Sequence, residues 1–525
     1  MFSERWSKEL RGARIFSAMF AAALIVSALV IGSLTAPFVR PAPPQGKPNI
    51  IFFFADDLAY WAIGSHPGAQ VKTPNIDRLM RQGVQFENAF NMGAWDGAVC
   101  VASRAMLLSG RHLWDAKTVV DEQWKKGEWA APTWGSLMRA EGYETFFTGK
   151  WHSAIRPAAV FDVVASIKRG MPRDAWNFTV MDEIAATLPS PKQFPDDVLP
   201  VGYNRPRDDS DSSWSPSDPT FGGYWAGGLH WSEGLRDDAI SYIRALDATA
   251  DPFFMFLSFN APHDPRQSPQ KFVDLYPPDD IQLPPNYLPA YPYRDDIGSG
   301  ASIRGESLAP MPRTPDAIRT HLAEYYALIT HMDQQIGQIM TSLDETGLRE
   351  NTYIVFTSDN GIAIGRHGLM AKQSMYEHSV RAPFSISGPT IPVGKVVKSP
   401  IYLQDAMATA LALAGADKPP ALFYKDVVPL IDEDADAHYP AIYAAYKDLQ
   451  RLIRKEDYKL IVYTQINTFL LFDLREDPHE INNLATDPGY SAIVDTLFHD
   501  LVDLQDSVGD ELDLAPIYAA WIDQQ

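Results

Sequence analysis

Four short apolar segments of the chain are each followed at once by side chains that could do chemistry. The segments cover residues 49–55, 143–147, 253–259 and 352–356. If they are parallel strands of one sheet, a ligand would bind beyond their carboxyl ends. The spacing therefore predicts one site that is assembled from four distant parts of the chain. The groups behind the segments are, in chain order, Asp56-Asp57, Lys150 with His152, His263, and Asp359-Asn360.

The oxygen-bearing members of this set suit a hard divalent cation. Carboxylate and amide oxygens favour Ca²⁺ or Mg²⁺ over zinc or copper. An Asp-Asp pair alone is more often a turn or a helix cap, but Asp-Asn behind another strand makes metal binding the better interpretation. Calcium tolerates mixed ligand geometry better than magnesium. We therefore predict one calcium ion held by Asp56, Asp57, Asp359 and Asn360.

Cys100 is the single cysteine of the chain, so it forms no disulfide within the chain. A lone cysteine is by default a small buried apolar residue, but its neighbours here favour a nucleophile. A helix is expected from Ser103 to Gly110, which places Cys100 near a helix N-terminus, where free N–H groups attract anions. Arg104 adds a fixed positive charge about one helical turn further on.

The segment that begins at Cys100 resembles the signature of the type I sulfatases, within the alkaline phosphatase superfamily. It has Ala102 where that family usually has proline and Ser109 where it has threonine, and neither departure removes a reacting group. The resemblance covers about residues 48–475. The positions in family order are Asp56-Asp57, Cys100-Val101-Ala102-Ser103-Arg104, Ser109-Gly110-Arg111, Lys150, His152, His263, Asp359-Asn360 and Lys372.

The resemblance implies an enzyme that hydrolyses a sulfate ester to an alcohol plus inorganic sulfate. A formylglycine-generating or other sulfatase-maturing enzyme would oxidise Cys100 to formylglycine, and residue 100 would then join the calcium ligands. Arg104, Lys150 and Lys372 would neutralise the sulfate oxygens. His263 would protonate the departing alcohol with help from Lys372, and His152 would accept a proton as sulfate is expelled. His367 and His378 lie near Lys372 in the sequence and are interpreted as structural or peripheral, with His367 the better candidate of the two to touch substrate.

Three other functions fit the sequence less well than sulfate ester hydrolysis. Phosphonate monoester hydrolases and some phosphodiesterases of the same superfamily also use formylglycine with a metal, and they are the nearest alternative. A cysteine protease would leave the Asp-Asp and Asp-Asn oxygens unexplained. A binding protein on a decayed sulfatase fold would have lost Cys100, Arg104 or Lys372, and all three are present.

Helical patterns alternate with the apolar segments, at residues 75–82, 133–140, 235–246 and 319–343. This alternation predicts an α/β fold with a large, mostly parallel sheet flanked by helices. Residues 157–232 and 277–315 are rich in Pro, Gly, Asp and aromatic residues, and are expected to form irregular insertions without sheet strands. Segments at 441–446, 450–454, 457–463 and 469–474, followed by a helix at 490–504, predict a smaller C-terminal α+β domain with an antiparallel sheet.

The N-terminus predicts export. Four basic residues, Arg5, Lys8, Arg11 and Arg14, precede an apolar run over residues 15–36. About 20 apolar residues can span a bilayer, so residues 1–36 form either a cleaved signal peptide or an N-terminal membrane anchor. The expected location is the periplasm or the outside of the cell. Residues 37–48 would be a Pro-rich linker, 49–420 the catalytic domain and 421–525 the smaller domain.

The composition limits the choice of partners. The formal net charge of −21 argues against nucleic acid, which needs a basic face. An anionic substrate therefore requires positive charge concentrated in one pocket. The expected partner is a sulfated small molecule or oligosaccharide, and a membrane contact is expected only through the N-terminal segment. Aromatic residues in the insertions could bind sugar rings or simply pack the loops; they include Trp214, Tyr224, Trp225, Trp231, Tyr291 and Tyr293.

Overall fold

The structure is a computed structural model that describes residues 46–172, 183, 186, 199–246, 251–300, 303–432 and 437–524. The part from Pro43 to Gln525 forms one compact unit. The predicted signal peptide or anchor and most of the linker lie outside the described residues. Within the described ranges, no helix is both long enough and apolar enough to cross a membrane.

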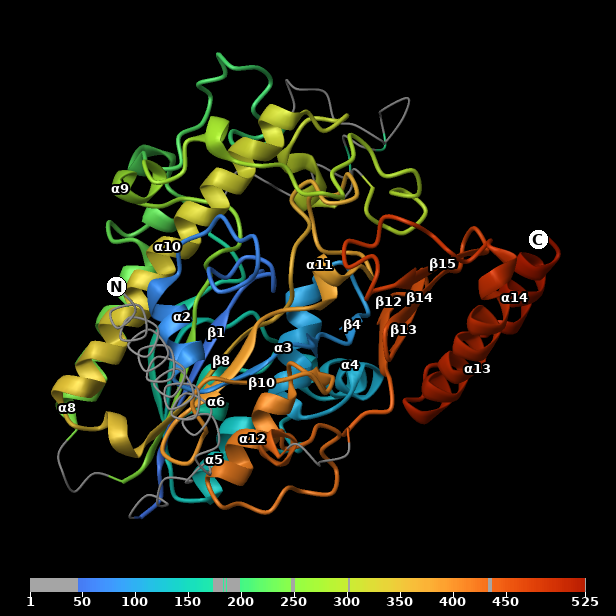
Figure 1. Cartoon of the computed structure of the whole chain (residues 1–525). Coiled ribbons are helices and arrows are strands. Elements are labelled where there is room, and N and C mark those ends of the chain that lie inside the picture. Colours follow the sequence, from blue (N-terminus) through green and yellow to red (C-terminus); the bar gives the residue numbers. More distant parts are fainter. Residues whose placement is uncertain are drawn as a thin grey trace, which may run out of the picture. The chain divides into compact units, whose positions relative to one another are not determined.

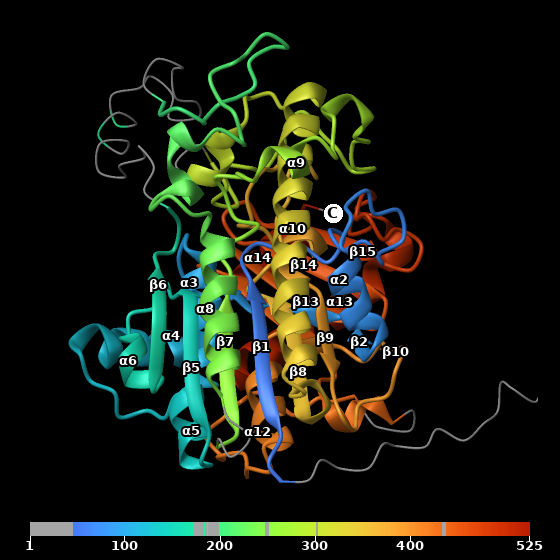
Figure 2. The same ribbon diagram turned by 90° about the vertical axis from the view of Figure 1, so that its left-hand side faces the viewer.

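An eight-stranded sheet forms the centre of this unit, in the order β10-β2-β9-β8-β1-β7-β5-β6 (Figures 1 and 2). The neighbours from β6 to β8 are parallel, β9 runs antiparallel to both β8 and β2, and β10 is parallel to β2. The predicted mostly parallel α/β fold is confirmed. The strands are β1 (Asn49–Ala55), β2 (Val84–Phe86), β5 (Glu144–Lys150), β6 (Val163–Lys168), β7 (Phe253–Ser258), β8 (Thr352–Ser358), β9 (Phe384–Ser387) and β10 (Lys395–Val397).

Helices cover both faces of this sheet, which explains the unbroken apolar run of β1. Ile50, Phe52 and Phe54 point into one hydrophobic core, and Ile51 and Phe53 point into a second core on the opposite face. The first core includes residues of α3 (Val99–Ser109), α4 (Leu113–Glu122), α5 (Trp134–Ala140) and α12 (Asp405–Leu413). The second includes residues of α2 (Pro74–Arg81), α8 (Trp231–Ala245) and α10 (Pro315–Glu345), which Figure 1 shows on the other side of the sheet.

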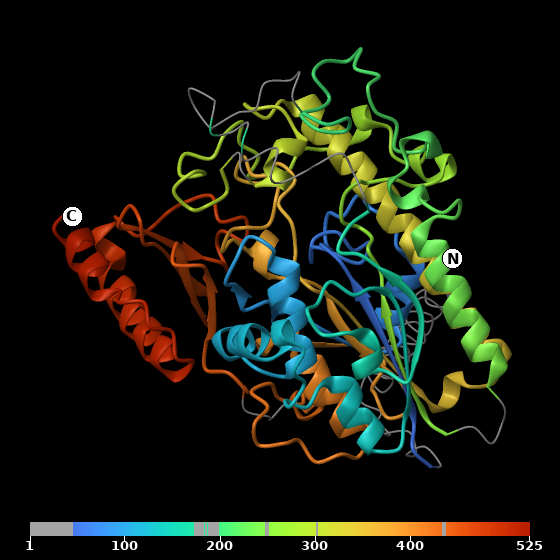
Figure 3. The same cartoon turned by 180° about the vertical axis from the view of Figure 1, so that it is seen from behind.

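A smaller five-stranded sheet has the order β15-β14-β13-β12-β4. Its last four strands along the chain are antiparallel, as predicted, and β4 from the N-terminal half pairs in parallel with β12. The C-terminal helices lie on the outer side of this sheet, as seen from both sides in Figures 1 and 3. The boundary at residue 420 stays a prediction. The elements are β4 (Gly93–Ala94), β12 (Ile442–Tyr446), β13 (Gln450–Lys455), β14 (Tyr458–Tyr463), β15 (Thr468–Asp473), α13 (Ser491–Ser507) and α14 (Ala515–Ile522).

One expectation about the insertions is wrong. Residues 157–232 were expected to contain no sheet strand, but β6 pairs in parallel with β5 at the edge of the large sheet. The Pro, Gly and Asp content of the whole segment indicated irregular structure, but β6 within it alternates half-buried with exposed residues and ends at Lys168. The described part of 277–315 carries only short 3-10 turns, at Pro278–Asp280 and Arg304–Leu308, as expected. The remaining short elements are β3 (Ala89–Phe90), β11 (Ile401–Tyr402), α6 (Pro157–Val160), α9 (Gln270–Val273) and α11 (Glu377–Val380).

Candidate active site

The register of the central strands brings their carboxyl ends to one edge of the sheet. Ala55 at the end of β1 pairs with Ser358 at the end of β8, and Gly149 of β5 pairs with Ser258 of β7. The next side chains along the chain are therefore neighbours. Asp56, Lys150 and Asp359 are all fully buried at this edge.

Helix α3 presents Cys100 to the same edge. The helix begins at Val99, four residues earlier than expected, so Cys100 lies inside its first turn. The sulfur is buried, and Lys372 Nζ lies 2.8 Å from Cys100 Sγ. Burial raises the pKa of the Cys100 thiol to about 12, although Lys150 and Lys372 oppose the effect. An unmodified thiol at this position is therefore protonated at neutral pH and a poor nucleophile.

The predicted metal ligands come together around Cys100. One ligand atom from each of Asp56, Asp57 and Cys100 lies within 4.8 Å of the others. The amide nitrogen of Asn360 donates a hydrogen bond to Asp57 Oδ1 at 2.7 Å. The backbone N–H of Asp57 donates to Asp359 Oδ1 at 3.1 Å.

The free acceptors of this cluster fit a divalent cation. Asp56 Oδ1 and Asn360 Oδ1 are buried and accept no hydrogen bond within the described part of the chain. Such acceptors are costly unless something binds them. Burial, followed by repulsion from Asp359, raises the pKa of Asp56 well above its usual value. A hard cation would satisfy both oxygens and relieve the repulsion between the carboxylates.

Two lysines face the carboxylates from the side. Lys150 forms an ion pair with Asp56, and Lys372 forms one with Asp57. Burial alone would lower the pKa of Lys372, but Asp57 above all holds it well above its usual value. The ammonium group of Lys372 lies beside the sulfur of Cys100 and Asp57, and that of Lys150 lies beside Asp56. Both are therefore placed where positive charge is needed to bind an anionic group of a substrate.

The guanidinium of Arg104 forms hydrogen bonds with neighbouring residues and does not point into open space. Its Nε and Nη2 donate to Asp359 Oδ2 at 3.2 and 3.1 Å, and Nη1 donates to Ser258 Oγ at 2.8 Å. Burial would raise the pKa of Asp359, but Arg104 and then Lys150 hold it below its usual value. Arg104 therefore positions Asp359. Ser258 was not predicted as a site residue from the sequence, although its position at the end of a buried strand could have indicated it.

His263 stands opposite Asp57 on the turn after β7. Its Nε2 lies 3.7 Å from Asp57 Oδ2, and its Nδ1 lies 2.8 Å from the carbonyl oxygen of Asp264. The Tyr224 hydroxyl donates to the His263 carbonyl at 2.8 Å and fixes the turn. Burial lowers the pKa of His263 to about 4, despite Asp264 and Asp57. Arg304, which the sequence did not single out, forms a two-pronged ion pair with Asp264.

His152 and His367 differ in their surroundings. Burial, with Lys150 next in importance, lowers the pKa of His152 to about 2, so its ring is neutral. His152 Nδ1 has no hydrogen-bond partner among the described residues. His367 instead stacks on Tyr376 at 3.8 Å, and its Nε2 lies 2.9 Å from the carbonyl oxygen of Glu480. This packing agrees with the interpretation of His367 as a structural residue.

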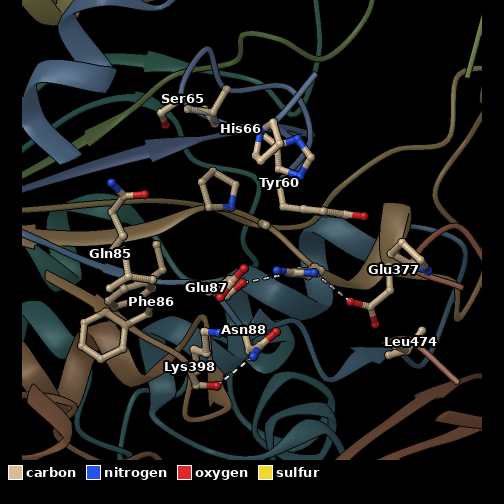
Figure 4. A pocket seen from close by; sticks show the side chains of 18 of the residues that line it. Tyr60, Ser65, His66, Gln85, Phe86, Glu87, Asn88, Glu377, Lys398 and Leu474 are labelled. Atoms are coloured by element: carbon tan, nitrogen blue, oxygen red, sulfur yellow. Dashed lines mark hydrogen bonds and ion pairs between the residues drawn. The ribbon is translucent and has the colours of Figure 1, made fainter. Parts of the chain in front are cut away.

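A large cavity lies elsewhere in the described part of the chain (Figure 4). It measures about 780 Å³ and is lined by Tyr60, His66, Phe86 and Glu377, among others. None of the predicted site residues lines it. We therefore place the active site at the carboxyl ends of the sheet strands and not in this cavity.

Comparison with protein families decides what kind of site this is. The family model described as Sulfatase matches residues 48–416, most of the chain. The chain belongs to the sulfatase family. This sulfatase is therefore a sulfuric ester hydrolase of the alkaline phosphatase superfamily, and its reaction is the hydrolysis of a sulfate ester. A second model, described as the C-terminal part of N-sulphoglucosamine sulphohydrolase, matches residues 365–507 of the sulfatase.

Known relatives match this sulfatase along most of its length. An ulvan-active sulfatase from Formosa agariphila is 28% identical over 486 residues, which cover 89% of this chain and 82% of the relative. A solved structure of BT4656 in complex with its substrate D-glucosamine-2-N,6-O-disulfate has a TM-score of 0.65 at 20% identity, covering 90% of this chain and 99% of that one. The phosphonate monoester hydrolase of Agrobacterium radiobacter also has a TM-score of 0.65 at 20% identity, covering 88% and 96%. These two structures show the shared fold.

Proposed function

We propose that this sulfatase hydrolyses a sulfated carbohydrate, with formylglycine made from Cys100 as nucleophile and one bound calcium ion. The observation that carries the proposal is the convergence of Asp56, Asp57 and Cys100, whose ligand atoms lie within 4.8 Å of one another. The names of the ulvan-active relative and of the glucosamine disulfate complex support a carbohydrate substrate.

Residue 100 has to be modified for this chemistry. The sulfur of Cys100 occupies the place that the formylglycine oxygens would take. Hydrated formylglycine carries two hydroxyl groups on one carbon. The oxygen of one bonds to sulfur as the alcohol leaves; the other then loses its proton, so that sulfate departs and the aldehyde returns. The protonated thiol, with its pKa of about 12, could not do this.

The residues that would hold the ion are Asp56, Asp57, Asp359, Asn360 and residue 100. When bound, calcium supplies a Lewis acid that favours loss of a proton from an oxygen nucleophile and balances the charge of the sulfate oxygens. Arg104 keeps the Asp359 carboxylate in place for this task through bonds of 3.1 and 3.2 Å.

The remaining side chains handle charge and protons. Lys150 and Lys372 neutralise sulfate oxygens in the transition state, where fixed positive charge lowers the barrier most. His263 and Lys372 flank Asp57 from two sides and deliver a proton to the departing alcohol oxygen. His152, whose neutral ring has an unpartnered Nδ1 among the described residues, accepts the proton lost when sulfate is expelled.

The nucleophile is tested with Cys100→Ala, purified beside the wild-type protein. Sulfate release from a monosulfated sugar is expected to vanish, while circular dichroism and the melting temperature stay close to wild type, since one small buried side chain replaces another. Mass spectrometry of the wild-type peptide around residue 100 should show the aldehyde. Equal sulfate release from both proteins would refute the covalent mechanism.

The ion is tested by chelation. Removal of divalent metal is expected to abolish activity, and calcium should restore it better than magnesium. Activity that persists after complete chelation would refute the metal site. The nearest alternative, a phosphonate monoester hydrolase or phosphodiesterase, is tested by comparing the hydrolysis rates of a sulfate ester and a phosphonate ester of the same aryl alcohol. A sulfatase should turn over the sulfate ester faster.

We also propose that the protein is exported and matured before it works. The basic and apolar residues of segment 1–36 support export to the periplasm or the cell exterior. Cell fractionation is expected to find the protein outside the cytoplasm, and N-terminal sequencing distinguishes a cleaved signal peptide from a retained anchor. Recovery of the mature protein only in the cytoplasm would contradict this proposal.

A further inference from the structure

A smaller cavity of about 120 Å³ lies beside the turn that carries His263. Asp264, Pro265 and Arg266 continue directly from His263 and form part of its wall. Other walls come from the insertion after β6 and from α10. The cavity is thus built around the same turn that holds a proposed proton donor. These other walls include Arg205, Trp214 and Phe221 from the insertion, and His321 from α10.

Asp264 at the cavity wall and Glu324 beside Arg205 are each already paired with an arginine. Arg205 donates from Nη1 and Nη2 to the two oxygens of Glu324, both at 2.6 Å. Arg304 binds both oxygens of Asp264, with Nη2 at 2.9 Å from Oδ1. In each pair an arginine engages both oxygens of one carboxylate. Each carboxylate is thus already paired with an arginine and acts on Arg266 without a direct hydrogen bond.

Arg266 is a third arginine at this cavity. Its side chain is almost fully buried, at 1% exposure, and its Nη1 lies 3.0 Å from His321 Nδ1. His321 carries no negative charge, and burial, then Arg205, lowers its pKa well below the usual value, so its ring is neutral.

Arg266 Nε and Nη2 have no hydrogen-bond partner within the described ranges. A guanidinium stays charged in proteins. Among the described residues no carboxylate forms a hydrogen bond with Arg266, so Asp264 and Glu324 offset its charge only in part. The guanidinium lies 5.9 Å from the centre of the Tyr325 ring.

The arginines of the large cavity do not share this property. Arg381 and Arg454 lie 3.4 and 3.8 Å from the carboxylate of Glu377, which Figure 4 shows at one side of that cavity. Arg475 pairs with Asp457. A buried charge that is only partly offset is expensive, so its occurrence beside the catalytic turn calls for a binding partner of opposite sign.

We propose that the Arg266 cavity binds an oxyanionic group, a sulfate or a carboxylate, and thereby favours substrates that carry a second anionic substituent. The N–H group of Trp214 Nε1, which is buried and has no acceptor among the described residues, offers a further donor at the cavity wall. The cavity volume of about 120 Å³ suits a group of a few atoms rather than a whole sugar. This inference rests on the proposed function and narrows its substrate to multiply charged esters.

The first test measures stability without any anion. Arg266→Met keeps an unbranched side chain and removes the guanidinium with its charge. Since the unpaired charge costs free energy in the empty protein, the variant should melt at the wild-type temperature or above. If Arg266 is instead a structural residue, the melting temperature should fall clearly, and the proposal is overturned.

The second test compares two substrates with the same scissile sulfate, one monosulfated sugar and one that bears a second sulfate. For Arg266→Gln we expect kcat/KM on the disulfated sugar to fall roughly tenfold or more, mainly through KM, because charged hydrogen bonds are lost. On the monosulfated sugar kcat/KM should stay within about twofold of wild type. Arg266→Lys should keep part of the preference.

Arg475→Gln is the matched control. This substitution changes the net charge by the same amount as Arg266→Gln, but at an exposed arginine that is distant in the sequence from Arg266. It should leave the substrate preference unchanged. An equal loss on both substrates for Arg266→Gln, or no loss on either, overturns the proposal. A wild-type protein that hydrolyses neither sugar would instead refute the proposed function.

A third arm identifies the source of the oxyanion. Inorganic sulfate is added to the wild-type protein and to Arg266→Gln during hydrolysis of the monosulfated sugar. If free sulfate fills the cavity, it should change the wild-type rate at saturating substrate and leave the variant unaffected. If the second substrate substituent fills it, sulfate should act only as a competitive product inhibitor in both proteins.

Discussion

Lys372 lies between the nucleophile and the predicted ion site. Its Nζ is 2.8 Å from Cys100 Sγ and pairs with Asp57. Lys372→Met should lower kcat about 100- to 1,000-fold, because one fixed positive charge is lost from the transition state. Steady-state kinetics on a monosulfated sugar measure the effect. Lys117→Met, which removes an exposed helix ion pair with Asp121, should leave kcat within about twofold. A Lys372 variant with wild-type kcat would remove this lysine from the reaction.

Cys100 and Arg104 were named from the expected helix and its motif, and Lys372 from the family resemblance. Residue type and position after a strand were enough to name the other seven residues of the predicted site. Their placement follows from the rule that parallel strands present their carboxyl ends to one edge. The sequence could not reveal Arg304 or Arg266 as partners, since each acts through a contact with a segment distant in the sequence. It also could not show that Arg104 is turned toward Asp359, because side-chain direction depends on what packs around it.

At the level of elements, α10 supplies the cap that α2 lacks. The Thr73 side chain accepts no hydrogen bond from the backbone N–H groups at the start of α2, and its hydroxyl donates to Asp77. Asp333 of α10 instead accepts the backbone N–H groups of Asn75 and Ile76, the latter at 2.7 Å. Free N–H groups at a helix start need such acceptors. The two helices are thus joined by a buried carboxylate.

Asp333→Asn is therefore expected to lower the free energy of unfolding by about 1–3 kcal/mol at neutral pH. Burial, partly opposed by the bond from Ile76, raises the pKa of Asp333 to about 6. An acid whose pKa is higher in the folded state loses stability as pH rises through that range. The wild-type advantage over the variant should therefore be larger at pH 5 than at pH 7. Urea unfolding at both pH values, with exposed Asp344→Asn as control, measures this, and a gap that shrinks at pH 5 would contradict it.

The sequence predicted the main elements better than the edges of the sheet. Strands β1, β7 and β8 are buried on both faces, so their apolar runs are unbroken and easy to recognise. Strand β6 has four apolar residues out of six and was missed because it lies in a segment whose Pro, Gly and Asp content indicated irregular structure. The short strands β2 and β4 depend on partners 300 or more positions away, which no local pattern encodes.

At the scale of the whole unit, the two sheets are linked through β4. Gly93 has a φ of +93°, and a Cβ there would lie 1.9 Å from the carbonyl oxygen of Ala445 on β12. Gly93→Ala should therefore separate the strands and lower stability by roughly 3 kcal/mol or more. Gly347→Ala is the matched control, with a φ of +73° but no atom within 4 Å, and should cost about 1–2 kcal/mol. Melting temperatures measure both, and equal losses would show that the contact with β12 does not matter.

The spread of the site along the chain also sets an order of events during synthesis. Cys100 leaves the ribosome long before Lys372, the residue 272 positions later whose ammonium group covers its sulfur. During that interval the thiol has neither its lysine neighbour nor the second half of the sheet around it. A maturing enzyme would find the cysteine accessible in the growing chain and enclosed in the finished one. Under the proposed maturation, oxidation of residue 100 would therefore have to precede the folding of the rest of the sheet around the thiol.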